Sequence, residues 1–175
     1  MSAPSAKMMV SIGDKTALVH IAGRANFTSS VDFKSLLDQL LQRGYTCFTL
    51  DLTECVLMDS TFLGVLAGFG LKLNSPQTDH VERTIWLFNP NSRISELLEN
   101  LGVLHLFKIT EGAVKTPENA TTKDVQTTDA SREKVTETCL KAHQTLMEIN
   151  PENATRFKDV TAFLADDLKK MKSGS

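Results

Sequence analysis

The spacing of the apolar residues changes repeatedly between residues 8 and 110. Short β-branched runs at residues 8–12 and 16–22, separated by Gly13-Asp14, predict a β-hairpin. Further short apolar runs predict strands at residues 45–52, 84–88 and 103–109. The resulting order β-β-α-β-α-β-α-β predicts a single α/β domain, with a mixed β-sheet and helices packed on it.

The segments between these runs predict helices that each bury one face. In residues 28–43 the apolar side chains recur at i, i+3, i+4, i+7 and i+8, and Gly44 follows the last of them. Residues 61–73 are apolar but contain several glycines, which suits a helix that lies close against a sheet. A third helix is predicted between Asn89-Pro90 and Gly102.

The composition is that of an ordinary globular protein and excludes several classes. With 41% hydrophobic and 23% charged residues and a formal net charge of -2, the chain is not collagen-like, disulfide-rich or largely disordered. No window approaches the ~18 uninterrupted apolar residues of a membrane span, and the first residues lack the apolar run of a signal peptide. We therefore expect a cytoplasmic chain without membrane insertion. Charge is balanced along the chain and forms no basic stripe, so no nucleic-acid partner is expected.

Residue types that often carry catalysis are scattered along the sequence. The three cysteines form no CxxC motif and are expected to be small apolar fillers: Cys47, Cys55 and Cys139. Three histidines have no nucleophile, carboxylate or metal ligand at a fixed spacing and are expected to be structural or solvated: His20, His80 and His105. We therefore expect no catalytic residues, no metal, no cofactor and no enzymatic activity.

One loop of the predicted domain has a distinctive sequence. Residues 57–66 read Leu-Met-Asp-Ser-Thr-Phe-Leu-Gly-Val-Leu, at the point where a strand ends and a helix begins. Asp59 or Ser60 is placed to cap that helix, and Ser60 and Thr61 put hydroxyls at its positive end, where a phosphate would be stabilised. Plain helix capping accounts for the same residue types, because Ser, Thr and Asp are preferred caps in any protein.

This segment resembles the signature of STAS domains, the anti-sigma-factor antagonist family, in which a hydrophobic residue precedes D-S-[S/T]-x-L-G. The resemblance extends over residues 8–110, since the order of elements, Gly23 after the second strand and the Asp51-Leu-Thr turn fall in the family's places. It implies that Thr61, with Ser60 as the alternative, is phosphorylated by an anti-sigma factor that is a serine/threonine kinase and is restored by a PP2C-type phosphatase. Such a protein is a bacterial regulator of transcription that acts by protein–protein interaction.

The resemblance also implies a partner-binding surface around this loop, formed by Asn26, Asp59, Ser60, Phe62 and Leu63. Two positions depart from the family pattern: Asn26 stands where antagonists commonly have Asp, and Phe62 where they often have Gly. We expect an exposed Phe62 and an unmodified Thr61 to dock on the anti-sigma factor. A phosphate beside Asp59 would end that contact because it adds negative charge.

The C-terminal part of the chain lies outside this resemblance. Residues 112–129 are rich in Thr and poor in large apolar side chains, which predicts a flexible linker between a STAS domain at 1–111 and the rest. Residues 130–172 predict a C-terminal helical hairpin that turns at Asn150-Pro151 and has one apolar stripe on each arm. Because two helices bury too little surface to be stable alone, the stripe must pack on the STAS domain, on a second copy in a homodimer, or on a partner.

An alternative interpretation keeps the STAS fold but removes the switch. In it the chain is a non-phosphorylated STAS scaffold or adaptor, a subunit of a lipid-transport ABC complex or of a stressosome-like assembly. The hairpin would then be its main contact.

Overall fold

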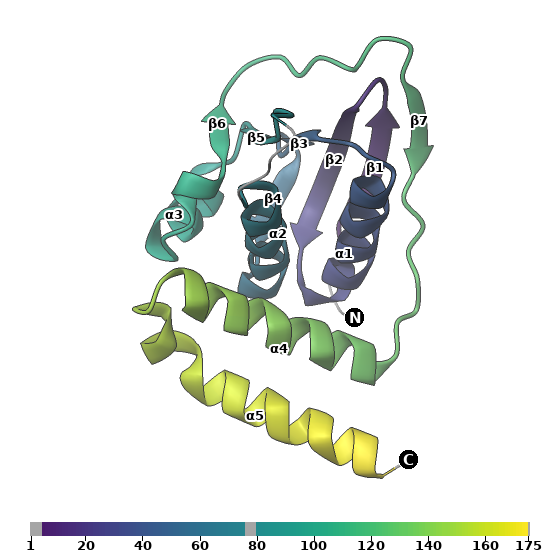
Figure 1. Cartoon of the computed structure of the whole chain (residues 1–175). Helices are drawn as coiled ribbons and strands as arrows, with labels where there is room; N and C mark the ends of the chain where they lie inside the picture. The colour runs from purple at the N-terminus through teal and green to yellow at the C-terminus, as the bar shows by residue number, and fades with distance from the viewer. Residues whose placement is uncertain (1–4, 76–79, 175) are drawn as a thin grey trace.

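The computed structural model describes residues 5–75 and 80–174, and Figure 1 shows the arrangement of its elements. In chain order these are β1 (Lys7–Ile12), β2 (Thr16–Ala25), α1 (Phe27–Gln42), β3 (Cys47–Asp51), β4 (Cys55–Met58), α2 (Ser60–Leu73), β5 (Thr84–Phe88), α3 (Ser92–Asn100), the 3-10 turn η1 (Leu104–Leu106), β6 (Lys108–Thr110), β7 (Thr121–Asp124), α4 (Arg132–Ile149) and α5 (Asn153–Ser173).

The strands form one mixed sheet, as the sequence predicts. The strand order is β6-β5-β3-β2-β1-β7, and β4 pairs with β2 beside this path. The neighbours from β6 to β2 pair in parallel, as β4 does with β2. Both pairs that involve β1 are antiparallel, which confirms the predicted β1–β2 hairpin. Parallel strands require crossover connections, and α1, α2 and α3 lie within these connections.

The segment at residues 112–129 differs from the predicted flexible linker. It contains β7, which pairs with β1 over four residues, and Ser11 Oγ lies 2.8 Å from Thr122 Oγ1 across the pair. Val125, next along the chain, packs against the hydrophobic core. The strand left no signal in the sequence because all four of its side chains are exposed, so it has no apolar alternation. A second unpredicted strand, β4, pairs with β2 and ends two residues before the first residue of α2.

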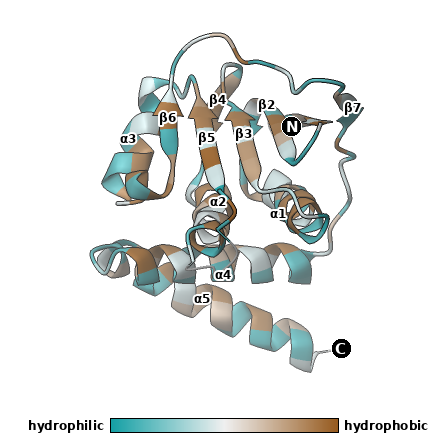
Figure 2. Cartoon of the chain, turned by 45° about the horizontal axis from the view of Figure 1, so that its top comes forward, coloured by the Kyte–Doolittle hydropathy of each residue, from teal (hydrophilic) through white to brown (hydrophobic). Residues whose placement is uncertain are grey.

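Helices α1 and α2 cover one face of the sheet, and the C-terminal hairpin lies beyond them (Figure 2). Phe33 of α1 and Phe62 of α2 stack in the core with ring centroids 4.2 Å apart. Helix α4 runs across α1 and α2, and α5 packs on the far side of α4. The predicted helical hairpin is therefore confirmed as two helices that pack together.

The stripe of α4 packs on the α/β domain of the same chain, the first of the three occupants considered above. Ala142 is 3% exposed and Leu146 is 0% exposed, and Leu146 belongs to the same apolar core as the sheet and α2. Asn153 reinforces the turn between the helices, because its Nδ2 donates to the carbonyls of Leu101 (3.0 Å) and Leu146 (2.8 Å). The contacts of the hairpin with the rest of the molecule are thus concentrated on α4.

Candidate functional site

Asp59 joins the starts of two helices. It is the N-cap of α2, and its Oδ1 accepts a hydrogen bond from the Phe62 N–H at 2.8 Å. Its Oδ2 accepts from the Phe27 N–H, the first residue of α1, at 2.7 Å. Burial raises the pKa of Asp59 above its ordinary value, although the N–H donors of Phe62 and Phe27 oppose that shift. One carboxylate therefore satisfies N–H groups at two positive helix ends.

The two predicted phosphate acceptors both face helix α4. Ser60, the first residue of α2, is half-buried, and its Oγ lies 2.9 Å from His143 Nε2. Thr61 is 5% exposed, and its hydroxyl donates to Cys139 Sγ at 3.6 Å. Residues Asp59, Ser60 and Thr61, called the DST loop below, are therefore covered by a helix that the sequence analysis placed in a separate hairpin.

His143 and Cys139 are site residues that the sequence analysis missed. His143 Nδ1 lies 2.7 Å from the Cys139 carbonyl oxygen, and because a carbonyl only accepts, Nδ1 carries the proton. In the neutral imidazole, Nε2 is then the acceptor for the Ser60 hydroxyl. Burial raises the pKa of the Cys139 thiol, the nearby Asp59 charge adds to the shift, and the hydrogen bond from Thr61 opposes it. The available signal was that Cys139 and His143 are four residues apart on one helix, next to the apolar stripe.

Two residues predicted to bind a partner are not accessible. Phe62 is 0% exposed and stacks on Phe33, so the expectation of an exposed Phe62 is wrong. Leu63 is also 0% exposed. The third and fourth residues of α2 lie in the hydrophobic core, because the apolar face of the helix begins there. The exposed aromatic beside Asp59 is instead Phe27, which is 48% exposed.

Asn26 caps the neighbouring helix. Its Oδ1 accepts from the Ser29 N–H (3.3 Å) and from the Thr28 hydroxyl (2.6 Å) at the start of α1. The next residue, Phe27, donates its backbone N–H to Asp59, so Asn26 directly precedes a residue that contacts the DST loop. The side chain of Asn26 thus serves α1, and its place in a partner-binding surface stays a prediction.

Glycines let α4 approach α2 closely. A Cβ on Gly64 would lie 2.5 Å from the Ala142 carbonyl oxygen and 2.7 Å from Ala142 Cβ. A Cβ on Gly68 would lie 3.5 Å from Thr145 Cγ2, which is ordinary van der Waals contact. The sequence analysis assigned these small residues to packing against the sheet. The structure places them against α4, and only Gly64 has no room for a side chain.

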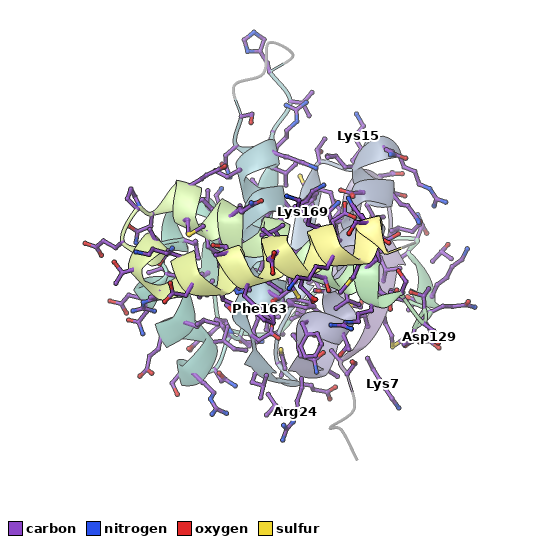
Figure 3. All side chains as sticks on the ribbon, turned by 90° about the horizontal axis from the view of Figure 1, so that it is seen from below. Lys7, Lys15, Arg24, Asp129, Phe163 and Lys169 are labelled. Atoms are coloured by element: carbon purple, nitrogen blue, oxygen red, sulfur yellow. The ribbon has the colours of Figure 1, made fainter. Side chains whose placement is uncertain are left out.

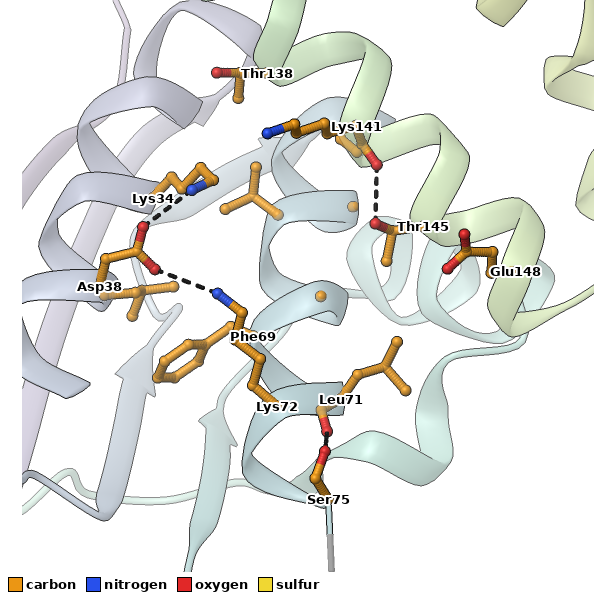
Figure 4. A pocket seen from close by; sticks show the side chains of 15 residues that line it. Lys34, Asp38, Phe69, Leu71, Lys72, Ser75, Thr138, Lys141, Thr145 and Glu148 are labelled. Atoms are coloured by element: carbon orange, nitrogen blue, oxygen red, sulfur yellow. Dashed lines mark hydrogen bonds and ion pairs between the residues drawn. The ribbon is translucent and has the colours of Figure 1, made fainter. Parts of the chain in front are cut away.

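A groove borders this helix contact (Figure 4). It has a volume of about 410 Å³ and lies between α1, α2 and α4. On one side, Lys34 and Lys72 approach the same carboxylate, that of Asp38, at 3.0 and 3.7 Å. Lys141 of α4 lies on the opposite side and pairs with Glu137 at 3.5 Å. Because α4 forms one wall, the groove exists in this form only while α4 is docked.

A second polar pair lies on the sheet. His20 Nδ1 is 2.7 Å from Asp51 Oδ2 on the neighbouring strand, so His20 has a carboxylate partner that its sequence spacing did not indicate. Burial alone would raise the pKa of Asp51, but hydrogen bonds from Thr53 and His20 lower it below its ordinary value. Within residues 5–75 and 80–174, no group of three His, Cys, Asp or Glu side chains is placed to hold a metal ion. None of the helices described is both long enough and apolar enough to cross a bilayer.

Comparisons with known proteins place the first part of the chain in a known family. The STAS domain family model matches residues 7–115, more than half of the chain, and the chain belongs to the STAS domain family. The match ends before α4, so the helix that covers the DST loop lies outside the family match. No curated protein matches the sequence.

Two solved structures share the fold at low identity. One is TM1081 of Thermotoga maritima, a candidate anti-sigma factor antagonist, with a TM-score of 0.52 and 22% identity over 60% of this chain and 86% of that chain. Another is the Bacillus cell fate determinant SpoIIAA in its phosphorylated form, with a TM-score of 0.50 and 14% identity over 61% of this chain and 91% of that chain. Such identities show the fold alone.

Proposed function

We propose that this STAS-domain chain is a regulator of the anti-sigma-factor antagonist kind, switched by reversible phosphorylation in the DST loop. The observation that carries the proposal is the position of Asp59, which accepts N–H groups from the starts of α1 and α2 while two hydroxyls follow it. Two positive helix ends favour a phosphate on either hydroxyl. A phosphate adds about -1.5 to -2 charge beside the Asp59 carboxylate, enough to change what binds this surface.

Burial supports Ser60 over Thr61 as the acceptor. A kinase must align the hydroxyl with the transferred phosphoryl group, so the hydroxyl must be accessible. Thr61, the acceptor implied by the family resemblance, is only 5% exposed, whereas Ser60 is half-buried. Because less of its surroundings must move to expose it, we assign Ser60 as the first acceptor and Thr61 as the alternative.

The unmodified loop would bind an anti-sigma factor that is also its kinase. Phe27 replaces Phe62 in this proposal as the aromatic anchor, because it is exposed and bonded to Asp59. Asn26 and Ser60 lie beside it and supply polar contacts. Phosphorylation would end the contact by like-charge repulsion and desolvation cost, and a PP2C-type phosphatase would restore it.

Intact mass spectrometry tests this function on the full chain. The protein is incubated with candidate anti-sigma-factor kinases and ATP, and then with a PP2C-type phosphatase. We expect a gain of one phosphate, which Ser60→Ala abolishes and the phosphatase reverses. Ser92→Ala is a matched control, because Ser92 is also the first residue of a capped helix, α3. The proposal is wrong if kinases that modify other STAS antagonists leave this chain unmodified, or if the phosphate lies outside the DST loop.

The cover over the DST loop favours a second candidate function. A hydroxyl held against α4 suits a non-phosphorylated STAS scaffold or adaptor, such as a subunit of a lipid-transport ABC complex or of a stressosome-like assembly. In that case the double variant Ser60→Ala/Thr61→Ala should bind its partner as the unchanged chain does. Under the first proposal, ATP and the kinase should release the unchanged chain from its partner and should not release the double variant.

A further inference from the structure

We propose that helix α4 is an intramolecular cover of the DST loop, and that the docked helix and a negative charge on Ser60 or Thr61 exclude one another. The chain would then alternate between the closed form of this structure and an open form in which α4 has left the start of α2. This inference rests on the proposed function, because it assigns the regulation of the same loop.

The contacts of α4 with the loop require uncharged hydroxyls. The Ser60 hydroxyl donates a hydrogen bond to Nε2 of neutral His143, and the Thr61 hydroxyl donates one to Cys139 Sγ. A phosphorylated oxygen has no proton to donate and adds three oxygens with negative charge. Thr61 is 5% exposed and His143 is 6% exposed, so the closed form leaves little access for a larger group or for water. A charge on either hydroxyl therefore breaks a bond, and a charge on Thr61 is also left without solvation.

Although the helix starts favour negative charge, the side chains around the loop in the closed form oppose a phosphate. Asp59 lies next to both hydroxyls, and its carboxylate already accepts two backbone N–H groups. The partner of Thr61 is a thiol, which offers no positive charge. On α4, His143 is the residue in contact with the loop whose cationic form could pair with a phosphate on Ser60. The test below therefore includes the outcome in which this pairing tightens the cover.

The half of α4 that covers the loop is held by small and polar side chains. The buried residues of this half are Thr136, Thr138, Ala142 and His143, and none has a large aliphatic side chain. The first large buried aliphatic residue is Leu146, one turn further along, where Asn153 also ties the turn to Leu101. Burial of small and polar groups contributes less than burial of Leu or Phe, so the covering half is the part of α4 that separates most readily.

A second tether precedes the helix. The N–H and hydroxyl of Thr128 both donate to the carboxylate of Asp32 on α1, at 3.1 and 2.5 Å. Opening must break these bonds as well as the two bonds to the DST loop. A ligand that binds only the open form must supply the free energy of breaking these bonds. A partner that binds the DST loop therefore competes with α4 for it.

The reaction of Cys139 with N-ethylmaleimide measures opening on the full-length chain without a kinase or partner. Cys139 is half-buried against Thr61, and burial raises the pKa of its thiol, so the closed form slows the reaction. Cys47 on β3 is half-buried away from α4 and serves as the internal reference in the same sample. Peptide mass spectrometry then gives the ratio of the two labelling rates.

Charge is tested with variants of equal size. We expect Thr61→Glu and Ser60→Glu to raise the Cys139 to Cys47 ratio about tenfold over Thr61→Gln and Ser60→Gln, within the usual range of coupling between sites. Equal ratios for the Glu and Gln variants would overturn the inference. A lower ratio for Ser60→Glu would overturn it too, since His143 would then pair with the charge and tighten the cover.

Two glycine variants test the cover without touching the loop. Gly64→Ala places a Cβ 2.5 Å from the Ala142 carbonyl and should raise the ratio by a similar factor, because α4 must shift. Gly68→Ala makes the same change one turn along α2, where there is room, and should leave the ratio unchanged. If both variants label alike, the close contact does not hold the cover and the inference fails. A missing phosphate in the kinase experiment would leave these labelling results intact, so the two proposals fail separately.

Discussion

Ser60 Oγ and His143 Nε2 lie 2.9 Å apart although 83 residues separate them in the sequence. The bond links the first residue of α2, inside the STAS family match, to a helix outside it. Together with Thr61 and Cys139 it makes the C-terminal hairpin part of the DST loop's environment. Seen from the side of the hairpin, α5 lies outermost (Figure 3). The proposed partner-binding surface therefore includes residues that contact a helix of the same chain.

Asp59 is expected to contribute to stability through both of its backbone hydrogen bonds. Asp59→Ala removes the N-cap of α2 and the acceptor for Phe27, and should lower the free energy of unfolding by about 1–2 kcal/mol. Urea denaturation followed by circular dichroism measures the change. Asp38→Ala, which breaks only surface ion pairs, should cost about 0–1 kcal/mol. Equal losses in the two variants would contradict the role given to Asp59.

Asp51 and Asp59 should influence the pH dependence of stability in opposite directions. The pKa of Asp51 is lowered from 3.8, so its contribution is present above pH 3.8 and is lost as the pH falls through the folded-state value. The pKa of Asp59 is raised from 3.8, so the protonation-linked part of its contribution, which is separate from its two cap hydrogen bonds, is present below pH 3.8 and is lost as the pH rises through the folded-state value.

Unfolding measured between about pH 3 and pH 6 tests this pair. Asp51→Asn should make stability rise less steeply with pH than in the unchanged chain, and Asp59→Asn should make it rise more steeply. Slopes that change in the same direction would show that one of the two assignments is wrong.

Leu146 is expected to stabilise the monomer and not a dimer. It is 0% exposed inside the chain, so Leu146→Ala should lower the free energy of unfolding by about 2–5 kcal/mol through the cavity it leaves. Phe163→Ala on α5 is the control: this side chain is 68% exposed and should change stability by less than about 0.5 kcal/mol. Light scattering on the same samples should give one oligomeric state for all of them. Dissociation caused by Leu146→Ala without loss of stability would restore the homodimer interpretation.

The sequence predicted those elements whose side chains are buried on one face. The β1–β2 hairpin and α1 were found because their apolar residues recur with a period of two or of a helical turn. The strand β7 was missed since its Thr, Lys and Asp side chains are exposed and only its backbone pairs with β1. Pairing of that kind depends on the partner strand, which a local pattern does not contain.

The DST loop was predicted from its residue types, but its surroundings were not. The orientation of α2 about its own axis buries Phe62 and directs Ser60 to α4. That orientation depends on the packing of α2 against Phe33 and Ala142. The apolar stripe of α4 predicted that the helix is covered, not which surface covers it. His143 and Cys139 acquired a role only from that contact between distant segments.

A reversible lock on α4 tests the central claim most directly. The Thr61 hydroxyl oxygen lies 3.6 Å from Cys139 Sγ, so Thr61→Cys places a second thiol against Cys139, within the half of α4 that covers the DST loop, and leaves Ser60 unchanged. Peptide mapping confirms the pairing, and phosphate incorporation from a kinase active on the unchanged chain is then measured with and without reductant. We predict no phosphate on Ser60 in the oxidised, locked chain, and phosphate on Ser60 after reduction. Equal phosphorylation of the locked and reduced forms would contradict the account, because the loop would then be accessible with α4 in place.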